Sequence, residues 1–265
     1  MIVVLCVFAV LIELWLFLTA PGLKRARADS WRGTAFAHRG LHDGDAPENS
    51  LAAFRKAVEN GYGIELDVRF SKDGHLIVFH DDELVRMTGH AAKPGDLTLA
   101  ELKQLRLVGS NEPIPTFDEV LETVAGKVPL LVEVKSCKNI GELTARTAER
   151  LAQYGGAYVM ESFNPFCLAH LKKHFPGVIR GQLVTTFKGY RKTRGGLGSM
   201  MLSGLLLNAV SRPDFVAYDK EMDRHAAIAV QRGLFHTPMA VWTLKKQEEV
   251  LHSGEMPIFE GFLLK

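Results

Sequence analysis

The stretch that decides the fold runs from residue 129 to residue 184, where PLLVEV (129–134), AYVME (157–161) and VIRGQLV (178–184) alternate with two longer segments. The three apolar runs have strand length, whereas the intervening segments Ile140–Tyr154 and Pro165–His174 have helical period. Strands that alternate with helices form a parallel sheet, because each helix returns the chain to the same edge. The stretch therefore predicts an α/β fold.

The same alternation continues in both directions along the chain. Eight strands are predicted, the number that closes a (β/α)8 TIM barrel: Thr34–Ala37, Gly63–Val68, Pro129–Val134, Ala157–Glu161, Val178–Val184, Asp214–Ala217, Met239–Val241 and Ile258–Leu263. Further helices are expected at Ser50–Asn60, Phe117–Val124 and Met222–Arg232. The turn Asp73-Gly74 predicts a hairpin after the second strand, and residues 82–116 then form a small insertion.

An apolar run, Ile2 to Ala20, precedes the barrel and is interrupted only by Glu13. At about 1.5 Å per residue this run spans the roughly 30 Å hydrocarbon core of a bilayer, so we interpret it as a transmembrane helix. Pro21-Gly22 ends the helix. Positive charges follow it and predict that the next domain is cytoplasmic; they are carried by Lys24, Arg25, Arg27 and Arg32. A cleaved signal peptide, with a small-x-small site at residues 26–28, is the alternative.

The expected organisation has three parts. Residues 1–22 form the transmembrane helix or signal anchor, residues 23–33 a basic juxtamembrane linker, and residues 34–265 the barrel. The net charge is only +2, with dispersed Lys and Arg, which argues against a nucleic-acid partner. The cysteines at 6, 137 and 167 are odd in number and widely spaced, so neither a disulfide framework nor a Cys-rich zinc site is predicted. A small or lipidic partner at a cell membrane is expected.

Acidic side chains gather on predicted barrel strands. Glu65 and Asp67 are two positions apart and lie on one face of their strand, as do Glu133 and Lys135 on theirs. Three carboxylates that converge in a core need a compensating cation, and hard oxygen ligands favour Mg²⁺ or Ca²⁺. Each glutamate taken alone could instead pair with a helix lysine on the outside. Together they predict one divalent metal site at the barrel mouth.

Two histidines end strands near these carboxylates. His38 follows the first strand and His80 follows the hairpin, and imidazoles titrate in the range that acid–base catalysis requires. Arg39 and Lys135 supply the positive charge that a phosphate needs beside a metal. The alternative for the histidines is a structural hydrogen bond, and for the two cations an ordinary ion pair.

The ordered set of motifs resembles the glycerophosphodiester phosphodiesterase family. The motifs are His38-Arg39-Gly40, Pro47-Glu48-Asn49-Ser50, Glu65-Leu66-Asp67, His80-Asp81 and Glu133-Val134-Lys135, with weaker blocks at Ser162-Phe163 and Val241-Trp242-Thr243. The resemblance covers Thr34 to near the C-terminus. The sequence departs from the family pattern at Phe259-Glu260-Gly261-Phe262, where many members continue into an aspartate-proline element.

The resemblance implies residue roles and a reaction. Glu65, Asp67 and Glu133 would hold one divalent ion, with Glu48 as a possible further ligand or orienting group, while His38 and His80 act as acid and base. The phosphate and substrate would be bound by Arg39, Asn49, Lys135 and Trp242. The implied reaction is hydrolysis of a glycerophosphodiester or of a lysophospholipid or phospholipid headgroup diester, by water or by way of a neighbouring hydroxyl. The alternatives are an inactive membrane-bound lipid-binding or scaffold protein and a barrel lyase that forms cyclic phosphates.

A mixed basic and apolar segment follows the fifth predicted strand. Its residues are Lys188, Arg191, Lys192 and Arg194, then Met200, Met201, Leu202 and Leu205 to Leu207. Cations beside apolar side chains are suited to an anionic bilayer surface, which favours a membrane lipid as substrate. The alternative is the core face of a barrel helix flanked by solvated cations.

Overall fold

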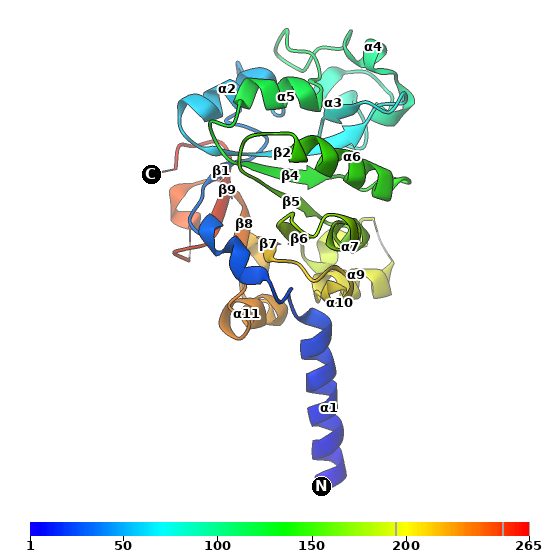
Figure 1. Cartoon of the computed structure of the whole chain (residues 1–265), viewed down its shortest axis with the longest axis vertical. Coiled ribbons are helices and arrows are strands. Elements are labelled where there is room, and N and C mark those ends of the chain that lie inside the picture. Colours follow the sequence, from blue (N-terminus) through cyan, green and yellow to red (C-terminus); the bar gives the residue numbers. More distant parts are fainter. Residues whose placement is uncertain (194, 251, 265) are drawn as a thin grey trace.

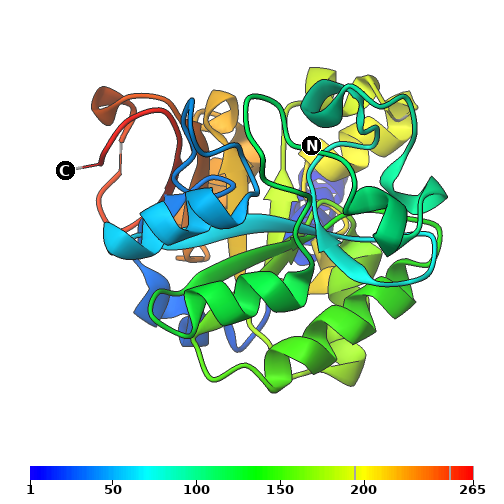
Figure 2. The ribbon, with the colours of Figure 1, turned by 90° about the horizontal axis from the view of Figure 1, so that it is seen from above.

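The computed structural model describes residues 1–193, 195–250 and 252–264. Eight parallel strands form a closed barrel, because β1 (Phe36–Ala37) pairs with both the second and the last strand of the ring. The other strands are β2 (Gly63–Phe70), β4 (Leu130–Val134), β5 (Tyr158–Ser162), β6 (Arg180–Val184), β7 (Phe215–Asp219), β8 (Met239–Leu244) and β9 (Met256–Phe259). The predicted (β/α)8 barrel is thus confirmed, and Figures 1 and 2 show its strands enclosed by helices.

Most of the predicted helices are present. They are α2 (Leu51–Glu59), α5 (Phe117–Val124), α6 (Ile140–Ala152), α7 (Pro165–His174) and α11 (Ala226–Gly233). The last begins four residues later than predicted, because Lys220–Met222 forms the short 3₁₀ helix η3 and His225 then caps α11 by accepting a hydrogen bond from Ala227 N–H. The cap fixes the start of this helix more strongly than its apolar pattern does.

The helical layer is irregular in the second half of the barrel. Between β6 and β7 the glycine-rich segment breaks into α8 (Phe187–Arg191), α9 (Gly196–Ser203) and α10 (Asn208–Ser211). After β8 the described residues form only the 3₁₀ helix η4 (Gln247–Glu249), and no helix follows β9 among them. Instead, Phe262 and Leu264 pack against the barrel core, and Leu264 O accepts a hydrogen bond from the Tyr62 hydroxyl.

The predicted hairpin and insertion lie after β2. β3 (Leu76–Val78) pairs antiparallel with β2, and the segment up to Thr116 contains α3 (Val85–Thr88), η2 (Pro94–Asp96) and α4 (Leu99–Leu102). Its buried side chains form a small core of their own: Ile77, Phe79, Leu84, Met87, Leu102, Leu107 and Ile114. The insertion is therefore held in a defined position beside the barrel mouth.

The segment before β1 closes the opposite end of the barrel. Arg25–Trp31 forms the 3₁₀ helix η1, and Ala28 is buried among residues that begin strands, such as Phe36 and Phe215. The Trp31 ring stacks on Phe36 at a centroid distance of 6.2 Å. Arg27 donates to the fully buried carboxylate of Asp214 at 2.5 Å. Residues 25–31 are thus part of the barrel floor.

Helix α1 (Ile2–Thr19) projects away from this structure (Figure 1). It is 18 residues long with a mean hydropathy of 2.8 and is almost wholly exposed, so its length and composition suffice to cross a membrane, although an N-terminal signal sequence meets the same criterion. Its C-terminal carbonyls are bound to the barrel: Thr19 O accepts from Asn208 Nδ2 at 2.9 Å and from Gln231 Nε2 at 2.7 Å. The guanidinium of Arg212 donates to Phe17 O and Ala20 O. The helix therefore continues into the barrel without a free linker.

Candidate active site

Three carboxylates meet at the barrel mouth. Glu65 and Asp67 alternate with buried Leu66 along β2, and Asp67 is in register with Glu133 of β4. One oxygen from each of the three residues lies within 4.8 Å of the others, and all three side chains are buried. The structure thus brings together the three residues predicted to hold a metal.

The electrostatics of this cluster favour a bound cation. Burial raises the pKa of Glu65 well above its usual value, and repulsion from Asp67 and Glu133 adds to the shift. Burial likewise raises the pKa of Glu133, although Lys135 opposes the change. Asp67 is different: its pKa falls despite burial, because Lys135, His80 and Arg39 stabilise the carboxylate. The site therefore holds more negative charge than its own cations can neutralise.

Two cations contact the cluster from opposite sides. Lys135 Nζ lies 2.9 Å from Glu133 Oε1 and 3.2 Å from Asp67 Oδ1. Arg39 Nε lies 3.8 Å from Asp67 Oδ2, while the Arg39 backbone N–H donates to Glu65 at 2.9 Å. Both side chains remain charged, since the carboxylates raise the pKa of Arg39 and of Lys135 despite burial. They are placed to contact a phosphate beside the carboxylates.

The loop after β1 has a positive φ at three positions, Arg39, Gly40 and Asn49. Asn49 has φ 56° and donates from Nδ2 to Asp67 Oδ2 at 2.9 Å, so it fixes one carboxylate directly. Gly40 has φ 82°, and a Cβ there would lie 2.9 Å from Ala53 Cβ of α2. Only glycine permits this backbone conformation at such a close approach to the helix. The loop therefore holds Arg39 and Asn49 against the carboxylates.

His38 belongs to a network of polar contacts that joins the end of β1 to the segment after β9. Its Nδ1 lies 2.5 Å from Glu260 Oε2, beyond β9, and its Nε2 lies 4.0 Å from Glu65 Oε2. Glu260 also pairs with Lys245 at 2.7 Å and lies 3.7 Å from His42 Nε2. Burial lowers the pKa of His38, and the Glu260 carboxylate opposes that shift. The position that departs from the family pattern therefore carries the partner of His38.

His80 belongs to a second network. Its Nδ1 lies 2.7 Å from Asp81 Oδ1, and burial lowers its pKa to about 4. Arg86 of α3 contacts Asp81 and also donates to both oxygens of Glu48, at 2.6 and 2.9 Å. Arg39 donates to Glu48 as well. The Glu48 carboxylate is thus held by two arginines outside the three-carboxylate group, which favours an orienting role for it.

These groups surround a cavity of about 140 Å³. Polar residues of both networks line one side, and Phe163, Leu183, Trp242 and Ile258 line the other. The Trp242 indole donates to Ala217 O and its ring lies 5.6 Å from that of Phe163, so an apolar wall faces the carboxylates.

A fourth carboxylate, Glu161 of β5, was missed by the sequence analysis. It is 1% exposed, lines the same cavity, and its Oε2 has no hydrogen-bond partner among the described residues. Glu161 lies two positions after Val159, which faces the barrel interior, so the period of the strand indicates that Glu161 faces inward as well. Four buried carboxylates face two cations, and this donor set matches a hard divalent ion such as Mg²⁺ or Ca²⁺.

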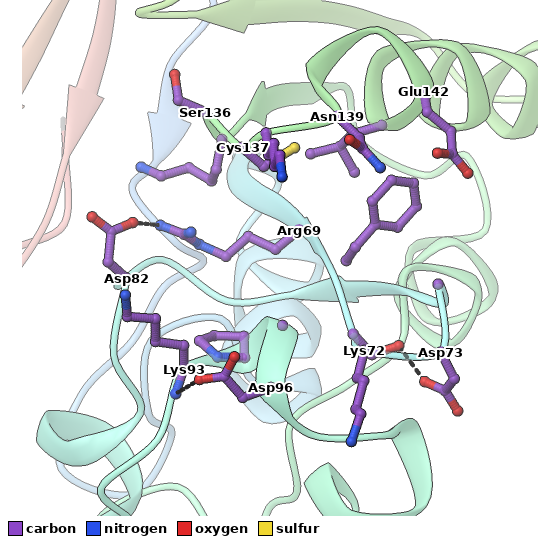
Figure 3. A pocket seen from close by; sticks show the side chains of 18 of the residues that line it. Arg69, Lys72, Asp73, Asp82, Lys93, Asp96, Ser136, Cys137, Asn139 and Glu142 are labelled. Carbon is purple, nitrogen blue, oxygen red and sulfur yellow. Dashed lines mark hydrogen bonds and ion pairs between the residues drawn. The ribbon is translucent and has the colours of Figure 1, made fainter.

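Figure 3 shows a second, larger cleft of about 1070 Å³. Lys135, which contacts Glu133 and Asp67, is among the residues that line it. One wall is formed by Ser136 to Asn139, between β4 and α6, and by Glu142 of α6, and the other by the end of β2 and by η2. Arg69 extends along it and donates to Asp82 at 2.7 Å. The insertion therefore builds one side of a polar cleft that opens from the candidate active site.

A sequence profile of the glycerophosphoryl diester phosphodiesterase family matches residues 38–253. The chain belongs to this family. The curated glycerophosphodiester phosphodiesterase of Caldanaerobacter subterraneus subsp. tengcongensis is 37% identical over 161 residues, which cover 56% of this chain and 65% of that protein. The match thus spans just under two thirds of the curated relative's length.

Two similar solved structures are also phosphodiesterases. A phosphodiesterase from Oleispira antarctica, in complex with the product sn-glycerol-3-phosphate, has a TM-score of 0.70 at 26% identity and covers 88% of this chain and 94% of that chain. The glycerophosphodiester phosphodiesterase of Thermotoga maritima has a TM-score of 0.65 at 28% identity, with 86% and 93% covered. The family match begins at His38 and ends before Glu260, so α1, η1 and Glu260 lie outside it.

Proposed function

We propose that this protein hydrolyses glycerophosphodiesters in a divalent-metal-dependent reaction. Family membership supports glycerophosphodiester hydrolysis. The observation that carries the proposal is the single cavity in which His38, His80, Glu65 and Glu133 face one another. A cavity with two imidazoles beside clustered carboxylates is suited to phosphodiester cleavage, because the reaction needs a proton acceptor, a proton donor and charge neutralisation.

The metal-binding role falls to Glu65, Asp67 and Glu133, and the ion would be Mg²⁺ or Ca²⁺. Such an ion polarises a phosphoryl oxygen when bound. Arg39 and Lys135 bind the phosphate from either side, Asn49 keeps Asp67 in place, and Trp242 contacts the substrate from the apolar wall.

Proton transfer falls to the histidines. Each has a carboxylate at Nδ1, Glu260 for His38 and Asp81 for His80, which fixes the ring and leaves Nε2 as the working atom. One Nε2 accepts the proton of the attacking nucleophile and the other donates a proton to the departing alcohol. Burial lowers the pKa of both rings, which favours the neutral form that the base needs. The ring that acts as the acid must carry a proton on both nitrogens, and the carboxylate at its Nδ1 stabilises that form.

We further propose that the substrate is a membrane lipid or lysolipid and that α1 anchors the protein as a single span. The elements between the cavity and α1 pack in part on one another: Phe163 contacts Tyr190 of α8, α8 packs on α9, and α10 packs on α1. On α9, Leu197 and Met200 are 69% and 52% exposed. The exposed cations Lys188, Arg191 and Lys192 lie beside them, whereas Arg194 lies outside the described residues. This combination suits an anionic bilayer surface.

The cytoplasmic placement of the barrel remains a proposal supported by the cations after α1. We likewise propose a division into a span (1–22), a basic segment (23–33) and a barrel (34–265). Within that division, the basic segment packs on the barrel floor through Arg27 and Ala28.

The function is tested by incubating the full chain in nanodiscs with glycerophosphocholine, glycerophosphoglycerol, a lysophospholipid and a diacyl phospholipid, with and without Mg²⁺ or Ca²⁺. We expect metal-dependent release of sn-glycerol 3-phosphate or its acylated form, and chromatography of the phosphate products separates hydrolysis from formation of a cyclic phosphate. His38→Ala and His80→Ala should each lower kcat by roughly 10²- to 10⁴-fold while metal binding persists. Turnover without metal, or in either variant at the wild-type rate, would contradict the proposal.

A further inference from the structure

The larger cleft begins where the metal-binding carboxylates end. Lys135 lines the cleft and also contacts Glu133 and Asp67, so a phosphate held there has one face toward the small cavity and one toward the cleft. The small cavity holds about 140 Å³ and the cleft about 1070 Å³. A phosphodiester has two ester arms, and the small cavity has room for one short arm. The cavity and the cleft share no lining residue, and the contact of Lys135 with Glu133 is the link along which the second arm would pass into the cleft.

Basic side chains outnumber acidic ones along the cleft, and Figure 3 labels several of both kinds. Six basic and four acidic side chains line it, which gives the lining a formal net charge of +2. Asp82 pairs with Arg69, whereas Asp73 and Asp96 accept hydrogen bonds from the backbone N–H groups of Leu99 and Lys93. Lys72, Lys93 and Lys138 have no ion-pair partner in the part of the chain that the structure describes. Their ammonium groups are thus available to a ligand.

We propose that this cleft binds the second alcohol of the phosphodiester and favours alcohols that carry negative charge, for example as a further phosphate group. The inference rests on the proposed function and adds to it the chemical class of the headgroup. Each exposed ion pair changes affinity by up to roughly fivefold, and Lys93 and Lys138 act from opposite walls. The preference should weaken at high salt, because exposed charges are screened.

The experiment compares kcat/KM of the full chain in nanodiscs for three soluble diesters of sn-glycerol 3-phosphate. The second alcohol is choline, glycerol or glycerol phosphate, so the arm is cationic, neutral or anionic. We expect the anionic diester to be preferred over the cationic one by about tenfold at low salt and by much less at high salt. Lys93→Glu and Lys138→Glu should each lower that ratio by about fivefold or more, with the neutral diester changed by less than about twofold. Lys93→Arg should keep the wild-type ratio.

Lys127→Glu is the matched control. Lys127 is also exposed and lies outside the cleft, and its replacement changes the net charge by the same amount as Lys93→Glu or Lys138→Glu. If both Lys93→Glu and Lys138→Glu keep the wild-type ratio between the anionic and cationic diesters, the cleft does not bind the headgroup and the inference is wrong. That result would leave the proposed function intact. A wild-type protein that hydrolyses a lysophospholipid but none of the three soluble diesters would overturn the inference alone, whereas one that hydrolyses neither kind of substrate would overturn both.

Discussion

Glu260 Oε2 lies 2.5 Å from His38 Nδ1, so a residue after the last barrel strand orients the imidazole after the first. The two are brought together because β1 and β9 are paired, with Ala37 in register with Phe259. Glu260 also binds Lys245, and its own pKa falls because His38 donates to it. We infer that Glu260 is a positioning residue for His38.

Glu260→Gln is expected to lower kcat by roughly tenfold or more while leaving metal affinity unchanged. Glu260 raises the pKa of His38 against the effect of burial, so its removal lowers that pKa further. The limb of the pH–rate profile that reports His38 should therefore move to lower pH, whether His38 is the acid or the base. Glu248→Gln, at an exposed position, is the control. An unchanged pH–rate profile in Glu260→Gln would count against this role.

Removal of one carboxylate from the proposed metal site should separate metal affinity from stability. Burial and repulsion raise the pKa of Glu65, so the ionised side chain opposes folding in the metal-free protein. We expect metal-free Glu65→Gln to melt at or above the wild-type Tm. Added Mg²⁺ or Ca²⁺, which should stabilise the wild type by about 2.7 kcal/mol at a hundredfold excess over Kd, should have little effect on the variant.

Asp67→Asn and Glu133→Gln should likewise lose the metal-induced rise in Tm, measured by scanning calorimetry. Glu122→Gln, an exposed carboxylate on α5, should keep it. A full metal-induced rise in all three cluster variants would show that the ion is held elsewhere.

The sidedness of the barrel can be measured with the native cysteines. Cys137 is exposed at the cleft, Cys167 is buried, and Cys6 lies on α1. With Cys6 replaced by serine, a membrane-impermeant maleimide should label Cys137 in broken cells and not in intact ones. Cys137→Ser provides the background. Labelling of Cys137 in intact cells would place the barrel outside.

The floor of the barrel depends on residues before β1. Arg27→Met removes the strongest partner of Asp214, which is fully buried, and should lower the free energy of unfolding by about 1–3 kcal/mol. Arg32→Met, which removes an exposed pair with Asp29, should cost less than about 1 kcal/mol. Denaturant unfolding of both variants checks the difference. Equal stabilities would mean that η1 adds little to the barrel.

Much of the fold could be predicted because its pattern is local. Each barrel strand is a short apolar run, and all eight lie within a few residues of their predicted bounds. The convergence of Glu65, Asp67 and Glu133 also followed from alternation along strands whose ends share one edge. These inferences need only the period of a strand and the direction of a parallel sheet.

The remaining features depend on contacts between distant parts of the chain. The partners Arg27 and Asp214 are 187 positions apart in the sequence, and His38 and Glu260 are 222 positions apart. No periodicity of the sequence indicates such pairs. Arg86 lies in the insertion on α3, which has no side-chain cap, and it reaches Glu48 from 38 positions away. Glu161 is the exception, because alternation with the inward-facing Val159 on β5 is a local signal that places its side chain inside the barrel.

The bonded junction between α1 and the barrel restricts how the enzyme could move. Two side-chain amides and one guanidinium hold the last carbonyls of the helix, so a tilt of α1 must turn the whole barrel with it. In a bilayer, such a body would rotate freely about the membrane normal but hardly about any other axis. The protein would then meet its substrate by diffusion in the plane of the membrane. The number of substrate molecules per unit area of membrane, rather than their bulk concentration, would set the rate of encounter.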